Sequence, residues 1–118
     1  MSPTTQQKTE WALASIALDD SFTDFILSRQ AMLCTKRTIE FYTFTLGKIL
    51  DWMKENGVNS PGDITSRYVR AYLAEMEGNG LSDSYIHSHA RVIKTFTRFL
   101  LQEGYIAVSY THLRAHET

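Results

Sequence analysis

Residues 35–57 read TKRTIEFYTFTLGKILDWMKENG, and this stretch decides the fold. Its large apolar residues recur at spacings of 3, 4, 3 and 4, which places them on one face of a helix. They are Ile39, Tyr42, Leu46, Ile49 and Met53. Thr35 can cap the helix, because its hydroxyl can accept a hydrogen bond from a free backbone N–H of the first turn. Gly57 stands where a helix commonly ends in a left-handed residue, so the pattern predicts a helix over residues 35–56.

Residues 82–103 repeat this pattern further along the chain. The apolar stripe has spacings of 4, 3, 4 and 3 and consists of Tyr85, His89, Val92, Phe96 and Phe99. Ser82 is the candidate N-cap, and Gly104 closes the segment. Because His89 lies on the apolar stripe, we interpret it as a core histidine and not as a ligand.

Two shorter helices complete the predicted fold. Residues 65–77 place Val69, Tyr72, Leu73 and Met76 on an inner face, and residues 21–33 form a first helix with Phe22, Phe25, Ile26, Arg29 and Leu33. The connecting stretches are short and turn-rich, and no strand-like alternation competes with the helical pattern. The sequence therefore predicts an all-α bundle of four helices over residues 21–107, preceded by an N-terminal arm over residues 1–20. Tyr42, Leu46, Phe96 and Phe99 are expected in its core.

Length and composition restrict the class of protein. The chain has 118 residues, enough for one domain, with 43% hydrophobic and 21% charged residues, as in a globular protein. A single cysteine, Cys34, excludes an internal disulfide. There is no apolar run of the roughly 18 residues needed for a membrane span, and the N-terminus lacks the pattern of a signal peptide. We therefore expect a cytoplasmic protein without membrane association.

The last eleven residues, VSYTHLRAHET, break the pattern. The string resembles the in-frame translation of a sequencing adapter, so we expect the native sequence to end near Ala107. The alternative is a natural disordered terminus. If the tail is adapter-derived, the His112 and His116 pair has no function, and we assign no metal site there.

Charge is balanced overall but uneven along the chain. The net charge is -1, which gives no broad attraction to nucleic acid. Residues 29–54 nevertheless carry five lysines and arginines against two acidic residues, and residues 82–101 carry three against one. Any anion-binding surface should therefore be local to these two segments.

No catalytic group of residues is evident. Cys34 has no base assigned to it by the sequence, and a merely structural cysteine is the preferred interpretation. Asp19 and Asp20 are best interpreted as a solvated helix entrance. The chain has no glycine-rich phosphate loop and no Cys-x-x-Cys pair, so we expect no cofactor, no metal and no enzymatic activity within it.

Two groups of polar residues are the candidates for binding an anionic partner. Lys36, Arg37 and Thr38 would lie in the first turn of the helix at 35–56, where free N–H groups and the helix dipole favour anions. On the helix at 82–103, polar residues at spacings of three to four could contact phosphates and base edges. The candidates there are His87, Ser88, Arg91 and Lys94. The alternative is that both are ordinary solvated helix faces.

Three segments in this order resemble the core-binding domain of tyrosine recombinases, the family of phage integrases and Xer-type enzymes. Thr35, Thr38, Tyr42 and Leu46 match the opening of that domain, although Lys36 replaces its usual proline. DITSRYVRAYLAEMEGNGLS resembles the next helix and turn, and SYIHSHARVIKTFTRFLLQEGYI resembles the last helix. The similarity extends over residues 22–106.

The resemblance implies a four-helix, SAM-like domain that binds double-stranded DNA with its second and fourth helices in the major groove. It further implies a catalytic domain C-terminal to it, with Arg, Lys, His and a nucleophilic Tyr, and nothing after residue 106 contains that complete set. The family's Asn-Pro after the last helix is also missing, in agreement with truncation there. Self-association would be expected through the full-length parent. On this basis Lys36, Arg37, Thr38 and Arg91 are expected at phosphates, and His87, Ser88 and Lys94 nearest to base edges. The competing hypothesis is a small helical module that binds other proteins.

Overall fold

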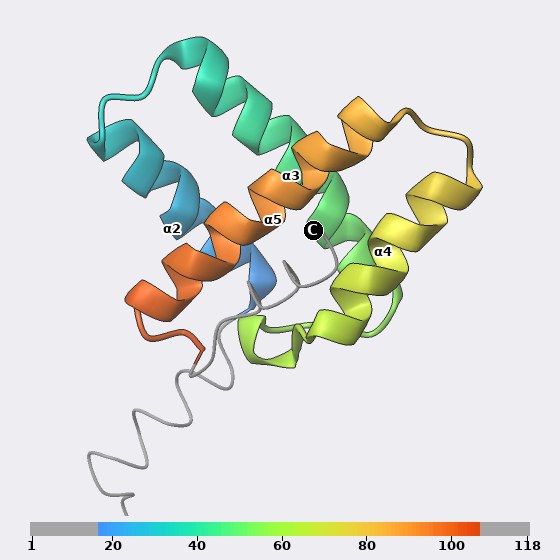
Figure 1. The fold of residues 1–118 in the computed structure, drawn as a ribbon. Helices are drawn as coiled ribbons and strands as arrows, with labels where there is room; N and C mark the ends of the chain where they lie inside the picture. The colour runs from blue at the N-terminus through green and yellow to red at the C-terminus, as the bar shows by residue number, and fades with distance from the viewer. Residues whose placement is uncertain (1–16, 107–118) are drawn as a thin grey trace, which may run out of the picture.

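The computed structural model describes residues 17–106, and this part of the chain contains four α-helices, one 3-10 turn and no strand. The helices are α2 (Leu18–Ala31), α3 (Lys36–Glu55), α4 (Ser66–Gly78) and α5 (Asp83–Gln102), and η1 (Pro61–Asp63) lies between α3 and α4. Figure 1 shows α5 crossing α3, with α2 packed at one side of this pair and α4 at the other. The predicted all-α, four-helix fold is confirmed.

Helices α3 and α5 begin and end where the sequence predicts. Thr35 accepts a hydrogen bond from the backbone N–H of Thr38, and Ser82 accepts one from the N–H of Tyr85. Gly57 and Gly104 follow the two helices with φ angles of +92° and +80°. These values lie in the left-handed region, which glycine adopts without the steric cost that a Cβ imposes.

Helix α2 differs from its predicted bounds of residues 21–33. It begins at Leu18, inside the stretch expected to be an arm, because Leu18 is buried and its N–H donates to the Asn59 carbonyl. It ends at Ala31, and Leu33 has a positive φ of 60° and an 89% exposed side chain. The prediction that the first helix extends to Leu33 was therefore wrong.

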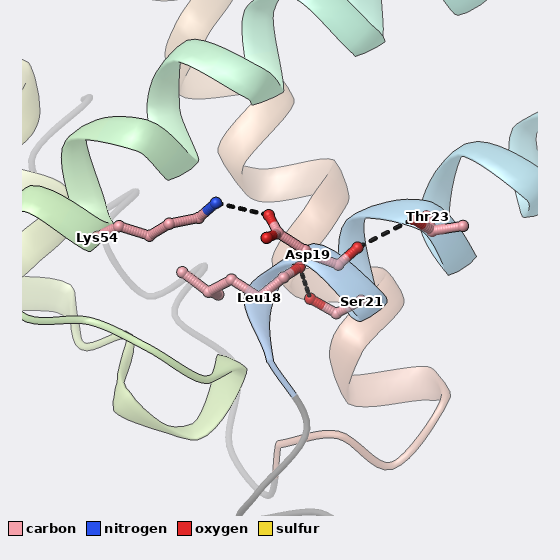
Figure 2. A network of polar contacts seen from close by, with 5 residues as sticks. All are labelled: Leu18, Asp19, Ser21, Thr23 and Lys54. Carbon is pink, nitrogen blue, oxygen red and sulfur yellow. Dashed lines mark hydrogen bonds and ion pairs between the residues drawn. The ribbon is translucent and has the colours of Figure 1, made fainter.

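An ion pair joins the start of α2 to α3, and a hydrogen bond within α2 lies beside it (Figure 2). Lys54 Nζ lies 2.6 Å from Asp19 Oδ1, and the buried Ser21 hydroxyl donates to the Leu18 carbonyl at 2.8 Å. Asp19 and Asp20 also lie in the first turn, where negative charge complements the helix dipole. The interpretation of these carboxylates as a helix entrance is confirmed.

Phe25 of α2 occupies the centre of the core and is fully buried. Its ring meets those of Tyr42, Phe96 and Phe99 edge-on, with centroids 5.3–5.4 Å apart. Leu46, Phe96 and Phe99 are buried as predicted, whereas Tyr42 is half-buried and packs against the core. One aromatic ring thus joins α2, α3 and α5.

A second group of rings joins α3, α4 and α5. The Trp52 ring packs against Tyr72 with centroids 5.3 Å apart, and Trp52 Nε1 donates to Glu75 Oε2 at 2.8 Å. Tyr72 Oη and His89 Nδ1 are 2.8 Å apart in the interior. His89 is 2% exposed, so the prediction of a core histidine is confirmed. Among residues 17–106, no helix has the length and apolar character needed to cross a membrane.

Candidate nucleic-acid interface

The first candidate cluster lies at the beginning of α3. The side chains of Lys36 and Arg37 are exposed, and Thr38 is half-buried. Thr38 belongs to the cap, because its N–H donates to Thr35 Oγ1 at 3.2 Å and its hydroxyl accepts from Thr35 Oγ1 at 2.9 Å. Lys36 and Arg37 are therefore the residues of this cluster whose charges face solvent.

The charge of this first turn is unfavourable for the helix itself. The first turns of α2 and α5 contain acidic residues, whereas those of α3 and α4 contain none, and α3 carries two cations there, Lys36 and Arg37. A positive charge at the positive end of the helix dipole destabilises the helix by about 0.3–1 kcal/mol. An anion bound at this turn would remove that repulsion.

The second candidate cluster lies on α5 and faces α4. His87 and Arg91 are exposed and Lys94 is half-buried, and all three line an open groove between α4 and α5 with a volume of about 1070 Å³. The floor of the groove is apolar and includes Leu73, Ala90 and Ile93. The structure thus brings three of the four predicted α5 residues to one depression.

Ser88 has a different environment from the other three. Its side chain is half-buried, and its hydroxyl donates to the Ser84 carbonyl one turn earlier at 3.1 Å. The hydroxyl can still accept a hydrogen bond, but its proton is used within the helix. Ser88 is not among the residues that line the α4–α5 groove.

Arg70 of α4 is a candidate that the sequence analysis missed. It is exposed and lines the groove opposite His87 and Arg91. The signal was present, because Arg67 and Arg70 are three residues apart on a helix whose apolar stripe lies elsewhere. The pattern alone did not show that α4 packs beside α5.

Lys48 is a second missed residue, and it joins α3 to α5. Its Nζ donates to Tyr85 Oη at 3.4 Å and lies 4.7 Å from the centre of the exposed Phe44 ring. In the sequence, only the position of Lys48 within the basic segment at residues 29–54 indicated a role in anion binding. The contact with Tyr85 depends on how the two helices cross, which a sequence pattern does not give.

The two candidate clusters remain on different helices. Lys36 and Arg37 lie at the start of α3, whereas Trp52, towards the other end of that helix, contacts Glu75 of α4. Lys48 lies between these positions and contacts α5. A surface shared by both clusters would therefore have to run along α3 and across Lys48.

Two buried polar groups, His89 and Tyr72, lie within hydrogen-bond distance of each other in the interior. Burial, with a smaller contribution from the charge of Lys48, lowers the pKa of His89 below its ordinary value of 6.5. Burial, with smaller contributions from Tyr85 and Glu75, raises the pKa of Tyr72 to about 12. Both groups are thus neutral near pH 7 and hydrogen-bond to each other. Within residues 17–106, no cluster of three His, Cys, Asp or Glu side chains could hold a metal ion.

The described residues do not include the expected adapter-derived segment at residues 108–118, which contains His112 and His116. The same holds for residues 1–16 of the expected N-terminal arm. Cys34 is partly buried at the link between α2 and α3, with its thiol free of any disulfide.

Comparison with protein families gives a match over most of the chain. The family described as phage integrase, N-terminal SAM-like domain, matches residues 20–104. Searches of curated proteins and of solved structures found no match. The matched range covers all of α3, α4 and α5 and all but the first two residues of α2. Because this range is well over half of the chain, the protein belongs to the phage integrase family through its N-terminal SAM-like domain.

Proposed function

We propose that this chain binds double-stranded DNA as the core-binding domain of a site-specific tyrosine recombinase. Membership of the integrase family carries the proposal, because that family acts in DNA recombination. In this proposal α3 and α5 face the major groove, with Lys36, Arg37, Thr38 and Arg91 at phosphates. His87, Ser88 and Lys94 would lie nearest to base edges.

The charge of α3 supports this role. Its first turn carries two exposed cations where an acidic residue would stabilise the helix, and it has no acidic residue there. Residues that weaken local stability without a packing benefit are typical of functional sites. A DNA phosphate at this turn would interact with both side chains and with the positive end of the helix dipole.

The grouping of basic side chains on α5 also supports a role in DNA binding. Arg91, Lys94 and His87 share one groove with Arg70 from α4, so four basic side chains border one depression. Glu77 is the acidic residue that lines the same groove. We propose that Arg70 adds a phosphate contact to those that the sequence indicated.

The role proposed for these 118 residues is binding and not catalysis. The match describes an N-terminal domain, and the sequence contains no set of Arg, Lys, His and Tyr after residue 106 that resembles the catalytic residues of recombinases. Strand cleavage would belong to a catalytic domain of the full-length parent. We also propose a cytoplasmic location and association with further copies when the parent assembles on DNA.

Duplex binding over a range of salt concentrations tests the proposal. Fluorescence anisotropy with a labelled 30-base-pair duplex of mixed sequence gives the dissociation constant of the wild type and of Arg91→Ala and Lys94→Ala. Each lost phosphate contact should weaken binding and flatten the slope of log affinity against log salt by about 0.9. The measurements should start at low salt, because non-specific binding has dissociation constants of about 10⁻⁴ to 10⁻⁶ M at physiological salt.

Lys54→Ala is the matched control. Lys54 is also a lysine on a helix, but it pairs with Asp19 on the side of α3 that faces α2. Its removal should leave the affinity and the salt slope unchanged. If Arg91→Ala and Lys94→Ala behave like Lys54→Ala, the assignment of the α5 residues is wrong.

The α4–α5 groove favours one alternative function, a module that binds other proteins. Its apolar floor and its volume of about 1070 Å³ would fit the apolar side of a partner helix. The salt series separates the two functions, because apolar binding is nearly insensitive to salt whereas phosphate binding is steeply weakened. Wild-type protein that does not bind the duplex at low salt would leave only the protein-binding function.

A further inference from the structure

A stripe of four exposed residues runs along α3, and the packing of the bundle does not explain it. Arg37, Phe41, Phe44 and Lys48 are spaced by 4, 3 and 4 residues, which places them on one side of the helix. Phe41 is 44% exposed and Phe44 is 63% exposed. We call this set the aromatic stripe.

The opposite side of the same helix makes the core. Leu46, Ile49 and Met53 are almost completely buried, so α3 buries a full apolar face without using Phe41 or Phe44. Two exposed phenylalanines on a helix that already has its core face are a feature that folding does not require. A pair of exposed aromatic rings on one helix face is typical of a binding surface.

Charge at the two ends of the aromatic stripe indicates what it binds. Arg37 lies one turn before Phe41, and Lys48 lies one turn after Phe44, with Glu40 the single acidic residue between these two cations. Lys48 is held in place by the Phe44 ring at 4.7 Å and by the Tyr85 hydroxyl at 3.4 Å. The surface is apolar at its centre and cationic at both ends, which is complementary to an anionic partner with an apolar interior.

The dimensions of the aromatic stripe agree with a DNA groove. Arg37 and Lys48 are eleven positions apart, so the two Cα atoms are about 16 Å apart along the helix. The major groove of B-DNA is about 12 Å wide and is flanked by a phosphate backbone on each side. If α3 lies across the groove, the two cations can reach the two backbones while the two rings lie over base edges.

The chemistry of phenylalanine indicates which group of the DNA the two rings can contact. A phenyl ring has no hydrogen-bonding atom, so it cannot read the donors and acceptors of the base edges. In the major groove, the apolar group that distinguishes one base from the others is the C5-methyl group of thymine. We infer that Phe41 and Phe44 contact thymine methyl groups and so give this protein a preference for A·T pairs beneath α3. The inference rests on the proposed function, since it requires duplex binding.

A duplex without methyl groups tests the inference. The probe is the same labelled 30-base-pair duplex, compared with a version in which deoxyuridine replaces every thymidine, so that only methyl groups are lost. Because all positions are changed, the result does not depend on where the protein binds. We expect the wild type to bind the deoxyuridine duplex about fourfold more weakly for each methyl group that it buries.

The double variant Phe41→Ala/Phe44→Ala should bind both duplexes with equal affinity. Its salt slope should stay close to that of the wild type, because all the cationic side chains are still present and Lys48 keeps its contact with Tyr85 Oη. Leu27→Ala is the matched control, since Leu27 is 56% exposed on α2 and lies outside the aromatic stripe. This variant should keep the full preference for the thymidine duplex. Circular dichroism verifies that all variants are folded.

The outcomes separate this inference from the proposed function. Wild-type protein that binds both duplexes equally, with a steep salt slope, would overturn the inference and leave the proposed function intact. A preference for thymidine that survives in the double variant would also overturn it. If the phenylalanine substitutions alter only the sedimentation of the free protein, the aromatic stripe is a contact between copies and the inference is wrong. Absence of salt-dependent duplex binding would refute both proposals.

Discussion

Replacement of Phe25 by alanine tests the architecture most directly. This ring is fully buried and makes edge-on contacts with three other rings on two helices. Removal of a buried phenylalanine costs about 3–5 kcal/mol in total, and aromatic pairs, each worth about 0.5–1.5 kcal/mol beyond the buried area, put Phe25 in the upper part of this range. We therefore expect Phe25→Ala to lower the free energy of unfolding by about 4–5 kcal/mol.

This loss is large for a domain of this size. The 90 described residues correspond to a total stability of about 5–13 kcal/mol, at 0.05–0.15 kcal/mol per residue. Phe25→Ala should thus remove a third or more of the stability and lower the midpoint of urea unfolding accordingly. Phe25→Leu, which keeps most of the volume but removes the ring, should cost about 1–2 kcal/mol.

Phe44→Ala provides the same chemical change at an exposed position. Because the Phe44 side chain is 63% exposed, this substitution should change the free energy of unfolding by no more than about 0.5 kcal/mol. Urea unfolding followed by circular dichroism at 222 nm measures all three variants with a common m-value. If Phe25→Ala costs less than about 1 kcal/mol, or no more than Phe44→Ala, then Phe25 does not occupy the centre of the core.

Two further predictions concern polar groups of the bundle. Burial lowers the pKa of His89 below 6.5, so the unfolded chain binds the proton more readily than the folded one. The contribution of neutral His89 to the free energy of unfolding should therefore be complete above pH 6.5 and decrease as the pH drops towards the folded-state pKa. His89→Phe should be less stable than the wild type near pH 7, since Tyr72 loses its hydrogen-bond partner. Its urea midpoint should fall less than that of the wild type on acidification. If the two midpoints fall equally, the protonation of His89 does not cause the loss of stability. Thr35→Ala should lower the free energy of unfolding by about 1 kcal/mol through loss of the α3 cap, whereas Thr35→Ser should keep most of the stabilisation that the cap provides. If the serine variant is as unstable as the alanine variant in urea unfolding, the hydroxyl does not cap the helix.

Local patterns were sufficient to predict most of the fold. The caps at Thr35 and Ser82 and the glycines after α3 and α5 are chemical signals that act within a few residues, and the structure confirms all of them. The start of α2 could not be predicted this way. Ala17 offers no capping side chain, and the first N–H of the helix is satisfied instead by the Asn59 carbonyl, more than forty residues later in the chain.

The candidate site was less accessible to sequence reasoning. The periodicity of α5 correctly put His87, Arg91 and Lys94 away from the core stripe, and the structure places them in one groove. Arg70 and Lys48 were missed because their significance comes from the packing of α4 and α3 beside α5, which is tertiary information. The family resemblance, in contrast, was visible in the sequence and is confirmed by the match over residues 20–104.

The hydrogen bond between Tyr72 and His89 has a consequence for how rigid the α4–α5 pair can be. Apolar contacts between two helices change little when one helix slides along the other by a turn, about 5.4 Å, because one ridge of side chains replaces the next. A buried polar pair allows no such replacement, since both atoms would lose their partners in an apolar environment. The Tyr72–His89 pair therefore holds the longitudinal alignment of α4 against α5, and with it the spacing of the basic side chains that border the groove.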